Sequence, residues 1–188
     1  LIKNAATELQ GGLKDIAVKD GKISEIGKNI PAEAGVEIIE AEGKFISPGF
    51  VDSHMHLDKT LTIGDREART LEEAIEEFTR YSSNRIGREW KEDIKRRARE
   101  AARQSLLAGT TTLRTHVNIE AGTDLHGVEA LFEIKEELKD FIDIKITSLP
   151  SFYDGEEAGK KRFELLEHAC KNGMFDFLGG ALNLHDEW

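Results

Sequence analysis

The chain has 188 residues, of which 39% are hydrophobic and 33% are charged, so it has enough apolar material for a folded core and is not disordered by composition. Its 36 acidic residues outnumber its 26 lysines and arginines, and the formal net charge of -10 disfavours nucleic acid and favours small neutral or cationic ligands. The single cysteine, Cys170, excludes an internal disulfide, and the chain has neither a signal pattern nor an apolar run of the roughly 20 residues that a membrane helix needs, so we expect a cytoplasmic location.

The first residues, 1–48, are expected to form a small β-sheet module. Apolar and polar residues alternate through GGLKDIAVKDGKISEIG around Asp20 and Gly21, a dipeptide that favours a two-residue hairpin turn because both positions accept a positive φ. A second alternating stretch, VEIIEAEGKFISPG, ends at Pro48 and Gly49. The opening letters LIKNA read as a strand in progress, and we expect both ends of the chain to be cut.

The pattern changes after Gly49 from strands alone to strands that alternate with helices. The long helix EWKEDIKRRAREAARQSLLAG is predicted to end at Gly109 and to have an apolar stripe, which comprises Trp90, Ile94, Ala98, Ala101 and Ser105. The strands TTLRTHVNI, FIDIKITSLP and MFDFLGGALNL follow, separated by the helices DLHGVEALFEIKEELKD and AGKKRFELLEHACKNG. This alternation predicts βαβ units and a parallel sheet.

With the earlier strand FISPGFVDSH, the pattern contains four parallel strands. A closed (β/α)₈ barrel needs eight strands and about 250 residues, so we expect an α/β fold that forms the first half of a TIM-like barrel over residues 49–188. A doubly wound sheet is the alternative. Neither G-x-G-x-x-G nor G-x-x-x-x-G-K-[ST] follows any of the strands, which makes nucleotide binding a weak hypothesis.

Two histidines, His54 and His56, lie two residues apart at the carboxyl end of the first barrel strand. Successive side chains of a strand point to opposite faces, so these two imidazoles share a face at the end where barrel enzymes build their sites. Together they are suited to holding a divalent metal. The same spacing also occurs by chance, and Asp58 is interpreted either as a partner that orients a ligating ring or as a solvated loop carboxylate.

Other polar residues are weaker candidates. His116, at the end of the second strand, either contacts substrate, supports the metal site or is a satisfied core histidine, and Arg114 on the same face is expected to pair with a carboxylate inside the barrel. The charge runs KRRARE and EIKEELKD are interpreted as solvated helix faces. Cys170 is expected to be a buried, inert thiol.

The stretches PGFVDSHMHLDKTLT, AGTTTLRTHVNI and ALFEIKEELKDFIDIKITSLP resemble the metal-dependent amidohydrolase superfamily, and within it the cytosine deaminase branch with its triazine hydrolases. The resemblance implies that residues 1–48 are part of a β-sandwich and that residues 49–188 are the amino-terminal half of a metal-dependent barrel. It implies that His54 and His56 bind one divalent metal ion, zinc or iron. It also places the general acid/base and the other ligands beyond Trp188, so this chain alone is expected to be inactive.

Two positions depart from the pattern of cytosine deaminases. Ser151 stands where those enzymes have a glutamine whose amide reads the pyrimidine edge, and Asn118 stands where they have an aspartate. The serine offers one hydroxyl in place of an amide. Ser151, a candidate substrate contact, therefore predicts that cytosine itself is a poor substrate.

These observations predict a hydrolase of non-peptide carbon–nitrogen bonds, which deaminates a cytosine-like pyrimidine or triazine through a metal-activated water. One alternative is an amidohydrolase of cyclic amides or N-acyl-amino acids, whose two-metal members often use a carboxylated lysine on the fourth strand, where MFDFLGGALNL has no lysine. An alternative of another class is a non-catalytic half-barrel module that binds a partner through a sheet edge. The expected partners are a small heterocyclic substrate and, in a homo-oligomer, a second copy of the chain.

Overall fold

A computed structural model describes residues 1–9, 11–62, 68–82, 87–119, 124–150 and 155–180 of the protein. The chain divides into two compact units, Leu1–Pro48 and Gly49–Trp188. Each unit has its own sheet and its own hydrophobic core, and each is described by itself.

The first unit is a four-stranded sheet with the order β3-β2-β1-β4. Its strands are β1 (Ile2–Ala5), β2 (Lys14–Lys19), β3 (Lys22–Gly27) and β4 (Ile39–Glu40). Asp20 and Gly21 have φ values of 50° and 72° and join the antiparallel strands β2 and β3, which confirms the predicted hairpin. The second predicted β stretch is reduced to β4 and an isolated parallel bridge between Ala6 and Phe45.

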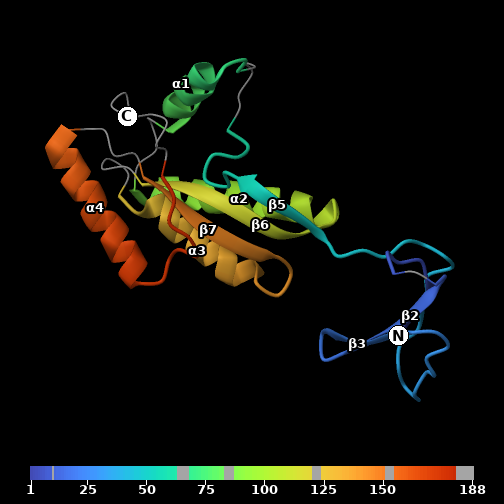
Figure 1. The fold of residues 1–188 in the computed structure, drawn as a ribbon. Helices are drawn as coiled ribbons and strands as arrows, with labels where there is room; N and C mark the ends of the chain where they lie inside the picture. The colour runs from blue at the N-terminus through green and yellow to red at the C-terminus, as the bar shows by residue number, and fades with distance from the viewer. Residues whose placement is uncertain (10, 63–67, 83–86, 120–123, 151–154, 181–188) are drawn as a thin grey trace. The chain divides into compact units, whose positions relative to one another are not determined.

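The second unit alternates strands and helices, as its sequence pattern predicts. Its elements are β5 (Phe50–Met55), α1 (Leu71–Ser82), α2 (Gly87–Leu107), β6 (Thr110–Ile119), α3 (His126–Leu138), β7 (Asp143–Pro150) and α4 (Gly155–Lys171). Strands β5, β6 and β7 form a parallel sheet in that order, and helices α2 and α3 lie against it (Figure 1). The predicted α/β fold with a parallel sheet is confirmed.

The fourth predicted strand is described only as far as residue 180. In that part, Phe177 forms an isolated parallel bridge with Thr147 of β7. The Ser148 N–H donates a hydrogen bond to the Phe177 carbonyl oxygen at 3.1 Å. The segment therefore runs along the free edge of β7, in the place of the expected next strand.

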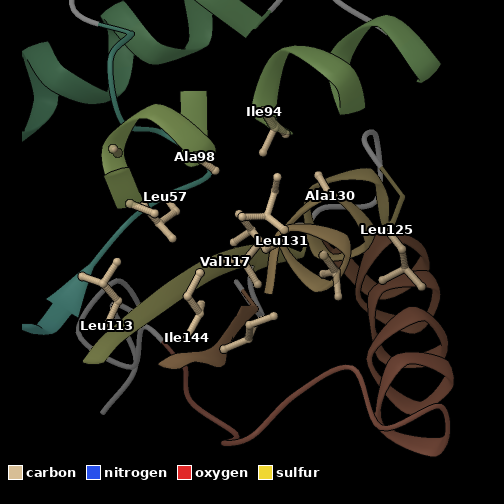
Figure 2. Packing of buried hydrophobic residues seen from close by; sticks show 14 of the residues in the cluster. Leu57, Ile94, Ala98, Leu113, Val117, Leu125, Ala130, Leu131 and Ile144 are labelled. Carbon is tan, nitrogen blue, oxygen red and sulfur yellow. The ribbon is translucent and has the colours of Figure 1, made fainter. Parts of the chain in front are cut away.

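The main core lies between the sheet and helices α2 and α3 (Figure 2). Leu113 and Val117 of β6 and Ile144 of β7 pack with Ile94 of α2 and Leu131 of α3, and none of these side chains is more than 1% exposed. Because the side chains of a strand alternate, Arg114 and His116 of β6 point to the opposite face. That opposite face carries His116 and Asn118, which belong to the candidate site.

Helix α2 confirms most of the predicted stripe, since Trp90, Ile94, Ala98 and Ala101 are all buried and Ser105 is half-buried. Gly109 has a φ of 93°, in the left-handed region, as expected for a residue that ends a helix. The interpretation of KRRARE as a solvated charged face is wrong for one of its charged members. Arg97 has no exposed surface because it follows Ile94 by three residues and lies on the same face of the helix.

The prediction of a buried Cys170 is also wrong, because this thiol is exposed. Helix α4 turns Arg162 and Ala169 inward, with exposed fractions of 1% and 0%. One residue advances a helix by a quarter to a third of a turn, which carries Cys170 away from that face. Among the described helices, none has both the length and the apolar character needed to cross a membrane.

Candidate metal centre

Three histidines meet on the sheet face opposite helices α2 and α3. His54 belongs to β5, His56 follows the end of that strand, and His116 belongs to β6. The parallel register pairs Met55, the last residue of β5, with Thr115, which places His116 beside the end of β5. The ring centroids are 5.2 Å apart for His54 and His56, 4.4 Å for His54 and His116, and 5.5 Å for His56 and His116. His54 and His56 thus share a face, as their spacing predicts.

The environment keeps the buried rings neutral. Burial, the Lys59 ammonium and the neighbouring histidines lower the pKa of His56 to about 4. Burial and His54 also lower the pKa of His116, against the effect of a hydrogen bond to the Met55 backbone. Only a neutral imidazole has a free ring nitrogen lone pair, so these shifts favour metal ligation at pH 7.

The three residues fit a divalent transition metal. Each offers one ring nitrogen, and these nitrogens lie within 4.8 Å of one another. Nδ1 of His56 is buried without a hydrogen-bond partner among the described residues, and such an atom is costly unless something binds it. Imidazole nitrogen is a suitable ligand for zinc and iron.

The turn after His56 is attached to the end of β6. The Leu57 N–H donates to Thr115 Oγ1 at 2.9 Å, and Lys59 Nζ donates to Asn118 Oδ1 at 2.6 Å. Asp58 is buried, which raises its pKa, and its Oδ2 accepts a 3.3 Å hydrogen bond from the Asn118 N–H. Its Oδ1 has no partner in the described part of the chain, so the proposed role in orienting a histidine ring stays a prediction.

The other candidate residues are less closely connected to the histidines. Arg114 lies on the same face of β6 as His116 but is exposed, and its guanidinium lies 5.6 Å from the centre of the Phe177 ring. Ser151 and the segment beyond residue 180, which includes Trp188, lie outside the described residues. Their predicted roles stay predictions.

Arg97 is a neighbour of the site that was missed in the sequence. It belongs to α2, yet its Nη1 donates to the carbonyl oxygens of Asp58 and Thr60 in the turn after His56. The signal was present, because Arg97 follows Trp90 by seven residues and Ile94 by three and therefore lies on the apolar stripe. The charged residues on both sides of Arg97 favoured the interpretation of a solvated face instead.

Known proteins are similar to this chain in sequence and in fold. The sequence model of the amidohydrolase family matches residues 37–127. The chain is 37% identical over 155 residues to N-isopropylammelide isopropyl amidohydrolase of Pseudomonas sp. (strain ADP), which covers 79% of this chain and 37% of the relative. The chain belongs to the amidohydrolase superfamily.

Solved structures of other amidohydrolases match most of the chain. The 5-methylcytosine deaminase from Klebsiella pneumoniae, in complex with 5-fluorocytosine, has a TM-score of 0.77 at 31% identity, over 95% of this chain and 42% of that one. The N-isopropylammelide isopropylaminohydrolase from Burkholderia multivorans has a TM-score of 0.79 at 28% identity, over 95% of this chain and 44% of that one. This amidohydrolase chain therefore spans less than half the length of these relatives. Members of the superfamily depend on metal, and this chain contains the cluster of three histidines.

Proposed function

We propose that the protein is a metal-dependent hydrolase that cleaves a carbon–nitrogen bond on a small pyrimidine or triazine ring. The observation that carries the proposal is the cluster of His54, His56 and His116 at the carboxyl end of β5 and in the carboxyl-terminal half of the parallel strand β6. Parallel α/β enzymes build their sites at the carboxyl ends of their strands. Relatives named for N-isopropylammelide and 5-methylcytosine support a heterocyclic substrate.

His54 and His56 are the proposed ligands of one divalent ion, zinc or iron, and His116 offers a third nitrogen. When bound, such an ion supplies a Lewis acid that makes hydroxide available near neutral pH. The protein keeps the His56 ring neutral, with a pKa of about 4, and holds the three rings together. Residues 174–184 contain no lysine, which supports a single metal over a pair bridged by a carboxylated lysine.

The proposal includes the architecture around the site. Strands β5, β6 and β7 would be the first three strands of a (β/α)₈ barrel, and residues 1–48 would be part of a β-sandwich. The parallel strand order and the TM-scores with amidohydrolases support this arrangement. The general acid/base beyond Trp188, a cytoplasmic location and a homo-oligomeric assembly stay predictions.

Elemental analysis of the intact protein tests the metal assignment. His54→Ala and His56→Ala should each lower the bound zinc or iron, because each removes one ring nitrogen from the cluster. His168→Ala is the matched control, since His168 is an exposed histidine of α4 and should leave the metal content unchanged. Undiminished metal in both His54→Ala and His56→Ala would exclude the assignment. It would then favour the non-catalytic module.

A panel of ring compounds tests the reaction. Release of ammonia or alkylamine is measured from cytosine, 5-methylcytosine and N-isopropylammelide, and ring opening is measured for a cyclic amide, which releases no amine. We expect turnover of a pyrimidine or triazine, with cytosine poor because Ser151 cannot replace both hydrogen bonds of an amide, and an unpaired group in a desolvated site costs about 1–3 kcal/mol. A preference for cytosine would contradict the Ser151 argument. A preference for the cyclic amide would support the alternative amidohydrolase activity.

A further inference from the structure

The turn formed by residues 57–62, which we call the His56 turn, is hydrogen-bonded back to His56. The Lys59 and Thr60 N–H groups both donate to the His56 carbonyl oxygen, at 3.0 Å and 2.9 Å. Thr62 Oγ1 donates to the Lys59 carbonyl oxygen at 2.6 Å. Any shift of this turn therefore moves the backbone of His56, and with it the position of the ring.

Arg97 of α2 holds the opposite side of the turn. Its Nη1 donates to the carbonyl oxygens of Asp58 and Thr60, at 3.0 Å and 2.7 Å. These residues are 39 and 37 positions apart from Arg97 in the chain, so the contacts tie the turn to a different element. A planar guanidinium holds its N–H donors in one rigid fork, so Nη1 can give one N–H to each carbonyl oxygen while Nε bonds to another residue.

Arg97 is itself held in place. Its Nε donates to Asp93 Oδ2 at 2.9 Å, and the Tyr81 hydroxyl also donates to the Asp93 carboxylate, at 3.0–3.1 Å. The guanidinium lies 5.5 Å from the centre of the Tyr81 ring and 5.6 Å from that of Trp90, within the range of cation–π attraction. A charged donor that is fixed on three sides gives the His56 turn a rigid reference point.

The burial of Arg97 lowers the stability of the fold, so stability alone does not explain why an arginine is present here. The Arg97 side chain has no exposed surface, and removing a cation from water is unfavourable even when it is paired. A well-packed apolar side chain at this position would often stabilise a helix equally well. An apolar side chain could not donate to the two carbonyl oxygens of the turn.

We propose that Arg97 is a positioning residue for the metal centre, which sets the place of the His56 ring by clamping the carbonyl oxygens of Asp58 and Thr60. The proposal rests on the proposed metal-dependent function. Arg97 acts through the His56 turn, so its loss should weaken metal binding while all three histidines are still present. Residues that orient metal ligands typically change metal affinity by about 10–100-fold when they are replaced.

The test compares Arg97→Met and Arg97→Lys in the intact protein, stripped of metal and titrated with zinc against a competing chelator. We expect Arg97→Met to weaken zinc binding by about 10–100-fold. Arg97→Lys keeps the charge but loses the fork, and should give a smaller loss. Amide hydrogen exchange is the second readout, in which the N–H groups of Lys59 and Thr60 should exchange faster in Arg97→Met. If Arg97→Met does not fold, zinc affinity and hydrogen exchange of Arg97→Lys decide whether Arg97 positions the metal centre.

Two controls separate positioning from general destabilisation. Arg96→Met removes an exposed neighbour that also donates to Asp93, at 2.9 Å, and should leave zinc binding unchanged. Ile142→Ala removes buried apolar atoms just before β7, at the amino end of the strands, and should lower stability without changing zinc affinity.

Two results would overturn the proposal. One is a folded Arg97→Met variant with zinc affinity within about twofold of the wild type and unchanged exchange of the turn. The other is an equal loss of affinity in Ile142→Ala. Retention of zinc in a double variant that lacks His54 and also lacks His56 would instead refute the metal assignment. Hydrogen exchange at Lys59 and Thr60 would still test whether Arg97 holds the turn.

Discussion

The two faces of β6 carry different kinds of side chain. On one face, Leu113, Val117 and Ile119 are completely buried and pack in the core with residues of α2 and α3. On the other face, His116 and Asn118 meet the end of β5 and the turn that follows it. The first face is mainly apolar, with Thr115 as its buried polar member, whereas nitrogen and oxygen atoms converge on the second.

The comparison shows how one strand serves both stability and chemistry. The helix-covered face contributes free energy of folding in proportion to the apolar area that it buries. The opposite face gathers polar groups that do not all satisfy one another, since His56 Nδ1 and Asp58 Oδ1 have no hydrogen-bond partner among the described residues. Unsatisfied buried groups weaken a fold, so their concentration here indicates a binding site.

The largest effect on stability should come from the helix-covered face. Leu113→Ala removes a fully buried side chain and should lower the free energy of unfolding by about 2–5 kcal/mol, through lost burial and a residual cavity. Urea denaturation measures the loss, and zinc affinity of the folded variant should not change. Leu107→Ala, at a position with 74% exposure, should stay within about 0.5 kcal/mol of the wild type. A large change in zinc affinity for Leu113→Ala would break the separation of the two faces.

An ion pair beside β7 should have the next largest effect on stability. Asp176 accepts 2.7 Å hydrogen bonds from Lys135 Nζ and from the Ile146 N–H. Burial raises the pKa of Asp176, but the bonds from Lys135 and Ile146 outweigh it and hold the pKa below its ordinary value. Asp176→Asn should cost about 1.5–3 kcal/mol at pH 7, because bonds to a charged group are lost.

The pH dependence of that cost follows from the direction of the shift. A carboxylate with a lowered pKa in the folded state stabilises the protein above its unfolded pKa of about 3.9, and the stabilisation is lost as the pH falls through the folded value. The difference between wild type and Asp176→Asn in urea denaturation should therefore be full at pH 7 and shrink below about pH 4. A difference that is the same at pH 3 and pH 7 would contradict the ion pair.

A substitution on the polar face should have the opposite effects to Leu113→Ala, with a large loss of zinc affinity and a small loss of stability. His116→Ala should weaken zinc binding by about 10–100-fold, equivalent to about 1.4–2.8 kcal/mol, and change the stability of the metal-free protein by less than about 1 kcal/mol. Chelator competition and urea denaturation give the two values, with His168→Ala as the control. Unchanged zinc affinity with a large loss of stability would make His116 a core histidine.

The smallest effect is expected where α2 and α3 pair through surface charges. Lys95 Nζ lies 2.7 Å from Glu133 of α3 and 3.7 Å from Glu92 of its own helix. Ion pairs with an exposed partner contribute about 0.2–1 kcal/mol, so Lys95→Ala should cost no more than this. The cost should fall further in 0.5 M salt, which screens the charges. An effect above about 2 kcal/mol would show that these charges, and not only the apolar face, hold the helices together.

Local sequence patterns account for the features that were predicted correctly. The hairpin at Asp20 and Gly21 depends on two adjacent backbone conformations, and the shared face of His54 and His56 depends on the period of two in a strand. The buried stripe of α2 depends in the same way on the period of a helix. The alternation of strands and helices led to the parallel sheet.

The sequence by itself therefore determined the elements, the parallel class of the sheet and the pair of histidines, because each depends on residues that are close in the chain. Only the tertiary structure decided which distant groups meet this pair. His116 joins it because β6 lies beside β5 in register, and Arg97 reaches the turn after His56 across 39 residues. The periodicity of a helix gives the face on which a residue lies. Only packing against a second element decides whether a charged residue such as Arg97 is solvated or is buried with hydrogen bonds from two of its nitrogens, Nε and Nη1.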